Sequence, residues 1–127
     1  MIIEELKGLL VKPNKLPEEI TFKNTLETKQ ELVDGYIEYA YSDDFPDVAF
    51  ICNEEGKIKG LPYNRDIGHD IIAGNFIIIS SMDDEGEDIS LSDSQIEKYK
   101  KIFNEKSIED TNLKITNILL QNNGFEL

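Results

Sequence analysis

The chain has 127 residues, 39% of them hydrophobic, and it carries a formal net charge of −13. This length corresponds to a single domain, and this hydrophobic content can build a core without disulfides or a metal ion. The acidic balance disfavours direct binding to nucleic acid or to an anionic membrane surface, because both need clustered Lys and Arg side chains.

The first third of the sequence predicts two strands and a helix. GLLVKP at 8–13 is read as a strand that stops at its proline, and EITF at 19–22 as a second, shorter strand. NTLETKQELVDG at 24–35 has the pattern of a helix, with Asn24 as the N-cap and Glu27 at the capping-box position three residues later.

The middle of the sequence is read as a run of strands. YIEYAYSDDF at 36–45 alternates along its length, which is strand periodicity, and VAFIC at 48–52 is an apolar strand. NEEGK and KIKGL, within 53–61, predict a hairpin turn followed by a returning strand. NFIIISSM at 75–82 is apolar on both faces and is therefore expected near the centre of the sheet.

The last third predicts helices. One begins with Ser92 as the N-cap and Gln95 at the capping-box position, and then repeats apolar residues at helical spacing: Ile96, Tyr99, Ile102 and Phe103. The segment from Ser107 to near Gly124 is read as a second helix capped by Ser107, although LKITNILL within it would also suit a strand.

This order of elements predicts the α+β class. Strands that are bunched together, rather than alternating with helices, favour an antiparallel sheet. We expect a small antiparallel sheet of about four to six strands, packed with two or three helices, in a single domain over residues 1–127.

The negative charge is concentrated in residues 36–92, which contain 13 acidic and three basic residues, a net of −10. Such a surface can bind a basic partner protein, and rows of carboxylates can imitate the phosphates of DNA. Simple solubility is the competing explanation. The acidic face expected to bind a partner consists of Asp43, Asp44, Asp47, Glu54, Glu55, Asp83, Asp84, Glu85, Glu87 and Asp88.

Catalytic and metal-binding patterns are weak. Cys52 and His69 are the only Cys and His, and thiol catalysis would also need a group that orients the histidine. A structural zinc site built on these two would need two carboxylate ligands. DDEGED at 83–88 fails the EF-hand pattern, because Asp88 and Ser94 stand where Gly and Glu are required. We therefore expect no enzyme activity, no metal and no cofactor.

An alternative small-ligand site lies in YNRDIGHDIIAGN at 63–75, a polar segment with two glycines that is expected to be a loop. Arg65 offers a planar fork for a phosphate or carboxylate, and Asn64 and His69 lie near it in the sequence. Pairing of Arg65 with a neighbouring aspartate is the competing structural explanation.

The single cysteine cannot form an internal disulfide, which fits a reducing compartment. The N-terminal residues MIIEELKGLL carry acids where a signal peptide needs bases, and no apolar run approaches the ~18 residues of a membrane span. We expect a cytoplasmic protein without a membrane partner. An exposed edge strand or the terminal helix could support a homodimer.

Several short motifs together resemble one protein family. Their order and spacing are similar to those of short proteins catalogued only as domain of unknown function number 3846, which occur in phages, plasmids and integrated elements of bacteria. The resemblance covers about residues 8–103 and leaves 104–127 as an additional C-terminal element. The motifs are Gly35-Tyr36-Ile37-Glu38, Asn53-Glu54-Glu55-Gly56-Lys57, Gly60-Leu61-Pro62 with Asn64, Gly74, and Ser90-Leu91-Ser92.

The resemblance implies a biological setting and no reaction. Accessory proteins of mobile elements are often non-enzymatic agents that act on host defence. We therefore expect a protein that binds and inhibits a host defence protein with a basic surface, of anti-CRISPR or anti-restriction type, through the acidic face. Two alternatives stay open: a sponge that sequesters a small nucleotide signal near Arg65 and His69, and a housekeeping protein of the element.

Overall fold

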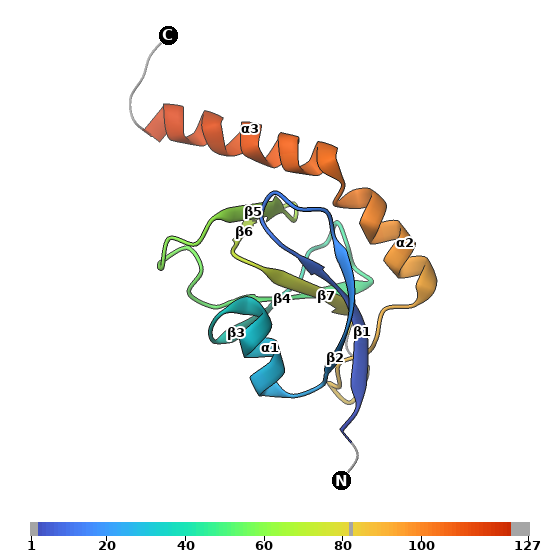
Figure 1. The fold of residues 1–127 in the computed structure, drawn as a ribbon. Helices are drawn as coiled ribbons and strands as arrows, with labels where there is room; N and C mark the ends of the chain where they lie inside the picture. The colour runs from blue at the N-terminus through green and yellow to red at the C-terminus, as the bar shows by residue number, and fades with distance from the viewer. Residues whose placement is uncertain (1–2, 82, 123–127) are drawn as a thin grey trace.

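The structure is a computed structural model in which residues 3–81 and 83–122 are described. Within these residues a five-stranded antiparallel sheet is accompanied by a two-stranded sheet and three helices, an α+β architecture as predicted (Figure 1). The elements in chain order are β1 (Glu5–Val11), β2 (Glu18–Lys23), α1 (Leu26–Val33), β3 (Ile37–Ala40), β4 (Val48–Asn53), β5 (Tyr63–Asp66), β6 (Ile71–Ala73), β7 (Phe76–Ser80), α2 (Asp93–Ile102) and α3 (Glu105–Asn122).

β7 is the central strand of the larger sheet, whose order is β2-β1-β7-β4-β3. Every neighbouring pair in it is antiparallel. The position of β7 confirms what its sequence predicted, because Phe76, Ile77, Ile78 and Ile79 are all fully buried. β2 and β3 form the two edges of the sheet.

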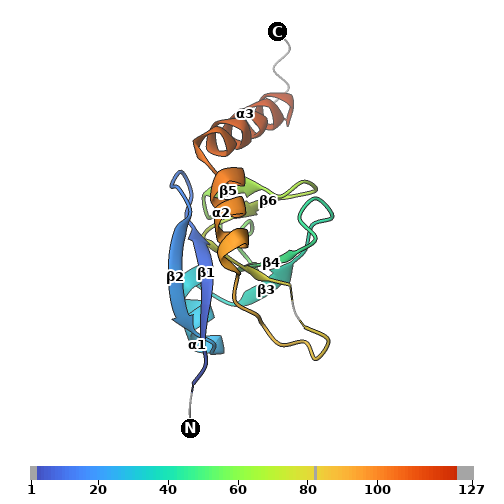
Figure 2. The ribbon, with the colours of Figure 1, turned by 90° about the vertical axis from the view of Figure 1, so that its right-hand side faces the viewer.

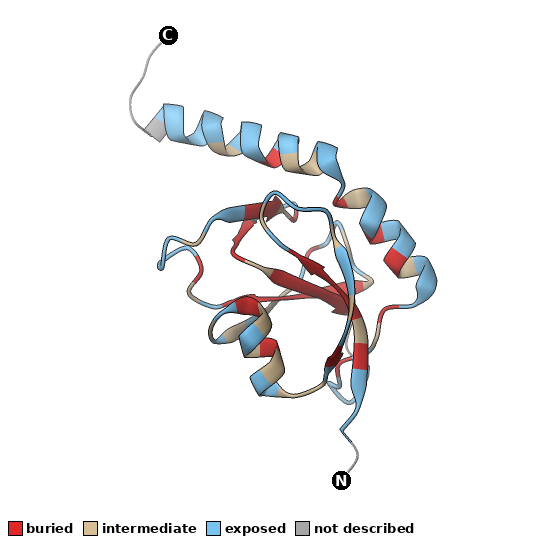
Figure 3. Ribbon diagram, in the orientation of Figure 1, coloured by how far each residue is buried: buried red, intermediate tan, exposed pale blue. Residues whose placement is uncertain are grey.

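Alternate residues of β4 point to the two faces of this sheet. Phe50 and Cys52 belong to the core beneath α2 and the β5–β6 hairpin, whereas Ala49 and Ile51 belong to the core beneath α1. Figure 3 shows the buried residues concentrated in the strands between these layers. The first core contains an aromatic cluster with ring centroids 5.6 to 6.2 Å apart, made of Phe45, Phe50, Phe76, Tyr99 and Phe103.

The capping box predicted at α2 is confirmed. The Ser92 side chain accepts a hydrogen bond from the backbone N–H of Gln95, and the Gln95 side chain accepts one from the backbone N–H of Ser92. The predicted cap of α1 is wrong by one residue: the helix is capped by Thr25, whose hydroxyl accepts a bond from the first turn, and not by Asn24. Thr and Asn are both good N-caps, so the sequence does not separate the two neighbours.

The helical interpretation of the terminal segment is confirmed by α3, but its predicted cap is wrong. The helix begins earlier, and Asn104 Oδ1 accepts a hydrogen bond of 3.1 Å from the backbone N–H of Ser107. Ser107 therefore lies inside the first turn rather than before it. The predicted end near Gly124 lies outside the described residues.

The hairpin predicted within 53–61 is wrong. Residues 54–60 form turns, and the chain re-enters a strand only at β5, which pairs with β6. β4 is already paired with β3 and β7, so it has no open edge for a returning strand. Gly56 is required by the close approach of β6, because a Cβ there would lie 2.5 Å from the carbonyl oxygen of Ala73. The expected loop at 63–75 likewise contains β5 and β6.

Replacing Phe50 with Ala should destabilise the domain by about 3–5 kcal/mol, because it opens a cavity in the aromatic cluster. Urea denaturation monitored by circular dichroism measures this free energy of unfolding. The control is Tyr36→Ala, at a side chain that is 64% exposed, which should change stability by about 0.5 kcal/mol or less. A similar small loss for both variants would contradict the packing described.

Candidate functional site

Arg65, expected in an exposed ligand loop, is fully buried. Its Nε donates a hydrogen bond to Ser107 Oγ (2.9 Å) and its Nη1 to Asn64 Oδ1 (3.0 Å). Its Nη2 donates to the backbone oxygens of Lys15 (2.6 Å) and Phe103 (3.3 Å). Burial lowers the pKa of the guanidinium to about 10, so the group stays charged at neutral pH. The fork is therefore fully engaged within the protein and joins β5 to the end of α2 and the start of α3.

Asn64 is buried as well. Its amide donates hydrogen bonds to the backbone oxygens of Val11 (2.9 Å) and Gly74 (2.8 Å), and its side-chain oxygen accepts the bond from Arg65. His69 alone of the expected ligand set is exposed, in the turn between β5 and β6. This corrects the predicted position of the ligand site, because the side chains of Asn64 and Arg65 face the interior.

Asp88, expected on the acidic face, forms a buried ion pair. Lys29 Nζ lies 2.5 Å from Asp88 Oδ2, and the Tyr39 hydroxyl donates to the same oxygen at 2.7 Å. The side chains of Lys29 and Asp88 are only 9% and 5% exposed. Burial, together with the neighbouring Asp88 carboxylate, raises the pKa of Tyr39, which keeps its hydroxyl a donor. Asp88 thus fastens the loop after β7 to α1 and is withdrawn from the exposed face.

Asp47 is only partly exposed and also has internal partners. Its carboxylate accepts hydrogen bonds from the Tyr99 hydroxyl and from Gln95 Nε2, and it lies 3.4 Å from Lys98 Nζ. Burial alone would raise the pKa of this carboxyl, but the bonds from Tyr99, Gln95 and the backbone, with Lys98 nearby, together hold the pKa below its usual value. Asp47 therefore anchors α2 to the loop before β4.

The other acids of the predicted face are exposed, apart from Glu55, which is half-buried and lies 4.0 Å from Lys59. The β3–β4 loop and the β7–α2 loop project on the same side of the molecule (Figure 2). A hollow of about 650 Å³ beside the second loop is lined by Glu4, Asp83, Glu85 and Glu87 among others. No Lys or Arg in the described part of the chain forms a salt bridge with Asp43, Asp44, Glu54, Asp83, Asp84, Glu85 or Glu87.

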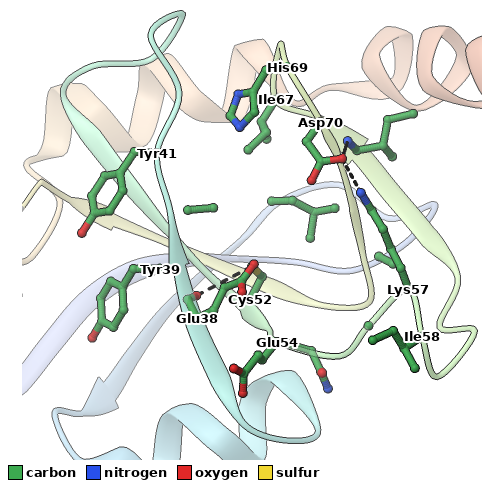
Figure 4. A pocket seen from close by; sticks show the side chains of 16 residues that line it. Glu38, Tyr39, Tyr41, Cys52, Glu54, Lys57, Ile58, Ile67, His69 and Asp70 are labelled. Atoms are coloured by element: carbon green, nitrogen blue, oxygen red, sulfur yellow. Dashed lines mark hydrogen bonds and ion pairs between the residues drawn. The ribbon is translucent and has the colours of Figure 1, made fainter.

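A cleft of about 520 Å³ separates β3 from the β5–β6 hairpin (Figure 4). Cys52 and His69 both line it, but the Cys52 side chain lies beside Glu38, whereas the His69 ring lies at the far end, near Ile67. The Cys52 thiol donates instead to the backbone oxygen of Glu38 at 3.7 Å. Burial, with Glu38 nearby, raises the pKa of this thiol to about 12. A protonated, buried thiol is a poor nucleophile.

Sequence reasoning missed the residues that hold these acids in place. Lys29 carries one weak signal, since it lies one helical turn before the fully buried Val33 and so shares its face of α1. The sequence predicts Tyr39 in a strand and indicates no partner for its hydroxyl. A sequence pattern does not show that Tyr39 and Asp88 meet, because they are 49 residues apart.

No group of three or more His, Cys, Asp or Glu side chains within residues 3–81 and 83–122 is placed to hold a metal ion. Among the same residues no helix is long and apolar enough to cross a membrane.

Arg65→Lys should lower the free energy of unfolding by about 3 kcal/mol, because a lysine cannot reproduce the fork and each hydrogen bond from a charged donor contributes about 1.5–3 kcal/mol. Hydrogen exchange should become faster in the first turns of α3. Lys101→Met, at an exposed lysine, serves as the control and should leave both measurements unchanged. Unaltered exchange in α3 of the Arg65 variant would contradict the anchoring role.

The Cys52 thiol should react with a disulfide reagent at pH 8 only after the protein is unfolded in urea. The reason is that the folded protein both buries the sulfur and keeps it protonated. The absorbance of the released thiolate measures the rate, and Cys52→Ser gives the background. Rapid reaction of the native protein would instead reveal an accessible, activated thiol.

Comparison with known proteins identifies the family. The model of the family described as a domain of unknown function, DUF3846, matches residues 6–104. No curated protein matches the chain, and no solved structure matches it either. The matched region runs from β1 to the end of α2 and leaves α3 outside. The resemblance carried by the motifs is thereby confirmed, and the chain belongs to the DUF3846 family.

Proposed function

We propose that this chain is a non-enzymatic accessory protein of a phage or mobile element, which binds and inhibits a host defence protein through its exposed acidic loops. The observation that carries the proposal is the set of exposed carboxylates without a salt bridge in the described residues, in the β3–β4 and β7–α2 loops and at Glu54. They do not include Asp47 and Asp88, whose carboxylates have internal partners.

Unpaired carboxylates favour a basic partner for two physical reasons. Each one repels the rest of a chain whose net charge is −13, so a basic surface that approaches relieves repulsion as well as adding attraction. Carboxylates clustered on one side also steer a basic protein during diffusion and raise the association rate. The hollow beside Asp83, Glu85 and Glu87 can receive basic side chains of such a partner.

The partner proposed is the nucleic-acid-binding surface of a host defence nuclease, because that surface must carry clustered Lys and Arg to hold phosphates. The chain would occupy it in place of nucleic acid.

The test uses phage plating on hosts that each express one restriction nuclease or one CRISPR effector. Expression of the chain should restore plaque formation in at least one host. Reversal of Asp83, Asp84 and Glu85 to Lys should remove this protection and weaken binding to the purified effector by about tenfold, because three exposed ion pairs at about 0.5 kcal/mol each sum to about 1.5 kcal/mol.

The matched control reverses Glu27, Glu97 and Glu109, which are exposed and lie outside the acidic face, so the net charge changes equally. It should protect as well as the natural chain. Binding should also weaken as salt rises, since exposed charges are screened. Protection by all three proteins alike, with no salt dependence, would refute the acidic face as the binding surface.

A further inference from the structure

The C-terminal half of α3 carries several large apolar side chains that are exposed. Within the described residues, Lys114 is the last residue of α3 whose side chain bonds to another element, with its Nζ 2.7 Å from Asp66 Oδ2. Residues 115–121 contain no charged side chain. Large apolar side chains that are left exposed on a helix are typical of a surface that meets another molecule.

The apolar side chains in the second half of α3 lie on two opposite sides of the helix, and all but the half-buried Ile115 are exposed. Ile115, Ile118 and Leu119 follow the i, i+3, i+4 spacing of one face. Leu113 and Leu120 are seven residues apart and share the other face. Leu113 is 62% exposed and Leu120 39% exposed. We name this second pair the α3 ridge.

A groove of about 310 Å³ runs between α3 and the β5–β6 hairpin. Ile115, Ile118 and Leu119 form its helical wall, and Tyr63 and Ile71 line its opposite side. In the described structure Ile118 and Leu119 are still 41% and 53% exposed, so the groove is open. We name it the α3 groove.

We propose that a second copy of this chain fills the α3 groove, in a dimer in which each protomer places its α3 ridge in the groove of the other. In the described structure, α3 carries an exposed apolar ridge on one side and borders an open apolar groove on the other. A twofold axis pairs the two reciprocally, which is the symmetry of an isologous interface. A reciprocal pairing also covers both apolar sides of α3, whereas a partner seated in the groove alone would leave Leu113 and Leu120 in water.

Charge favours this place for contact between copies. Two chains of net charge −13 repel each other, and the repulsion is least where no charged side chain lies. Lys57 and Lys114 at the groove have carboxylate partners on their own chain, Asp70 and Asp66. The dimer is therefore held by apolar burial, and its affinity is limited by long-range repulsion that added salt screens.

Sedimentation equilibrium over a wide concentration range tests the proposal on the full chain. We expect a dimer that dissociates on dilution and grows stronger with salt. Leu113→Glu in the ridge and Leu119→Lys in the groove should each raise the dissociation constant at least about tenfold, because the twofold axis places each unpaired charge in an apolar contact twice. Lys106→Gln, which makes the same charge change as Leu113→Glu in the first turn of α3, should have no effect.

Mixing the two variants gives the decisive result. In a mixed dimer one site joins the Glu ridge to the Lys groove and the other joins two natural surfaces, so association should return to nearly the natural strength. Circular dichroism checks that each variant is folded. A natural chain that stays monomeric at every concentration would overturn the proposal, as would a dimer that neither variant weakens or a mixture that fails to associate. These outcomes are independent of whether the chain inhibits a defence protein.

Discussion

The buried guanidinium of Arg65 is the interaction on which the arrangement of the C-terminal elements depends. An isolated charge in the interior is strongly unfavourable unless hydrogen bonds compensate it. No carboxylate of the described residues pairs with this group, so backbone and neutral side-chain acceptors compensate it instead. One acceptor is the carbonyl of Phe103 at the end of α2, where the helix dipole is negative. The α2–α3 junction therefore must close over β5 before the charge is satisfied.

The need to compensate a buried charge with hydrogen bonds also divides the acidic residues into two groups. Asp47 and Asp88 have hydroxyl and lysine donors on other elements, and they hold α2 and α1 against the sheet. Asp83 uses its Oδ1 only within its own turn, where it accepts from the backbone N–H groups of Glu85 and Glu87. Residue type does not separate these groups. Long-range contacts are needed to tell them apart. Only the structure therefore shows that a part of the acidic residues in the middle of the chain forms the exposed surface.

The sequence predicted most of the helices and strands, but not the β5–β6 pair and not how the strands pair. Apolar runs such as Phe76–Ile79 predicted a central strand correctly, because burial on both faces leaves no polar position. The predicted hairpin after β4 is wrong because β4 is already paired on both edges, with β3 and β7, and Gly56 is required by the close approach of Ala73. The predicted exposure of Arg65 is wrong because a charged residue in a polar segment is usually exposed. The four acceptors that satisfy its guanidinium come from distant parts of the chain or from its neighbour, which the local sequence does not show.

The α3 groove and the acidic β7–α2 loop lie on different parts of the molecule, and this separation has a physical consequence. α3 lies at the end of the molecule away from the β7–α2 loop (Figure 2). A dimer formed through α3 therefore leaves both copies of the β7–α2 loop open to solvent, whereas the β3–β4 loop adjoins His69, which also lines the α3 groove. Two such surfaces on one particle make the second binding event intramolecular wherever the partner presents two basic sites within reach. A weak, salt-sensitive contact, as expected of exposed carboxylates, gains most from such pairing, because each single contact is weak on its own.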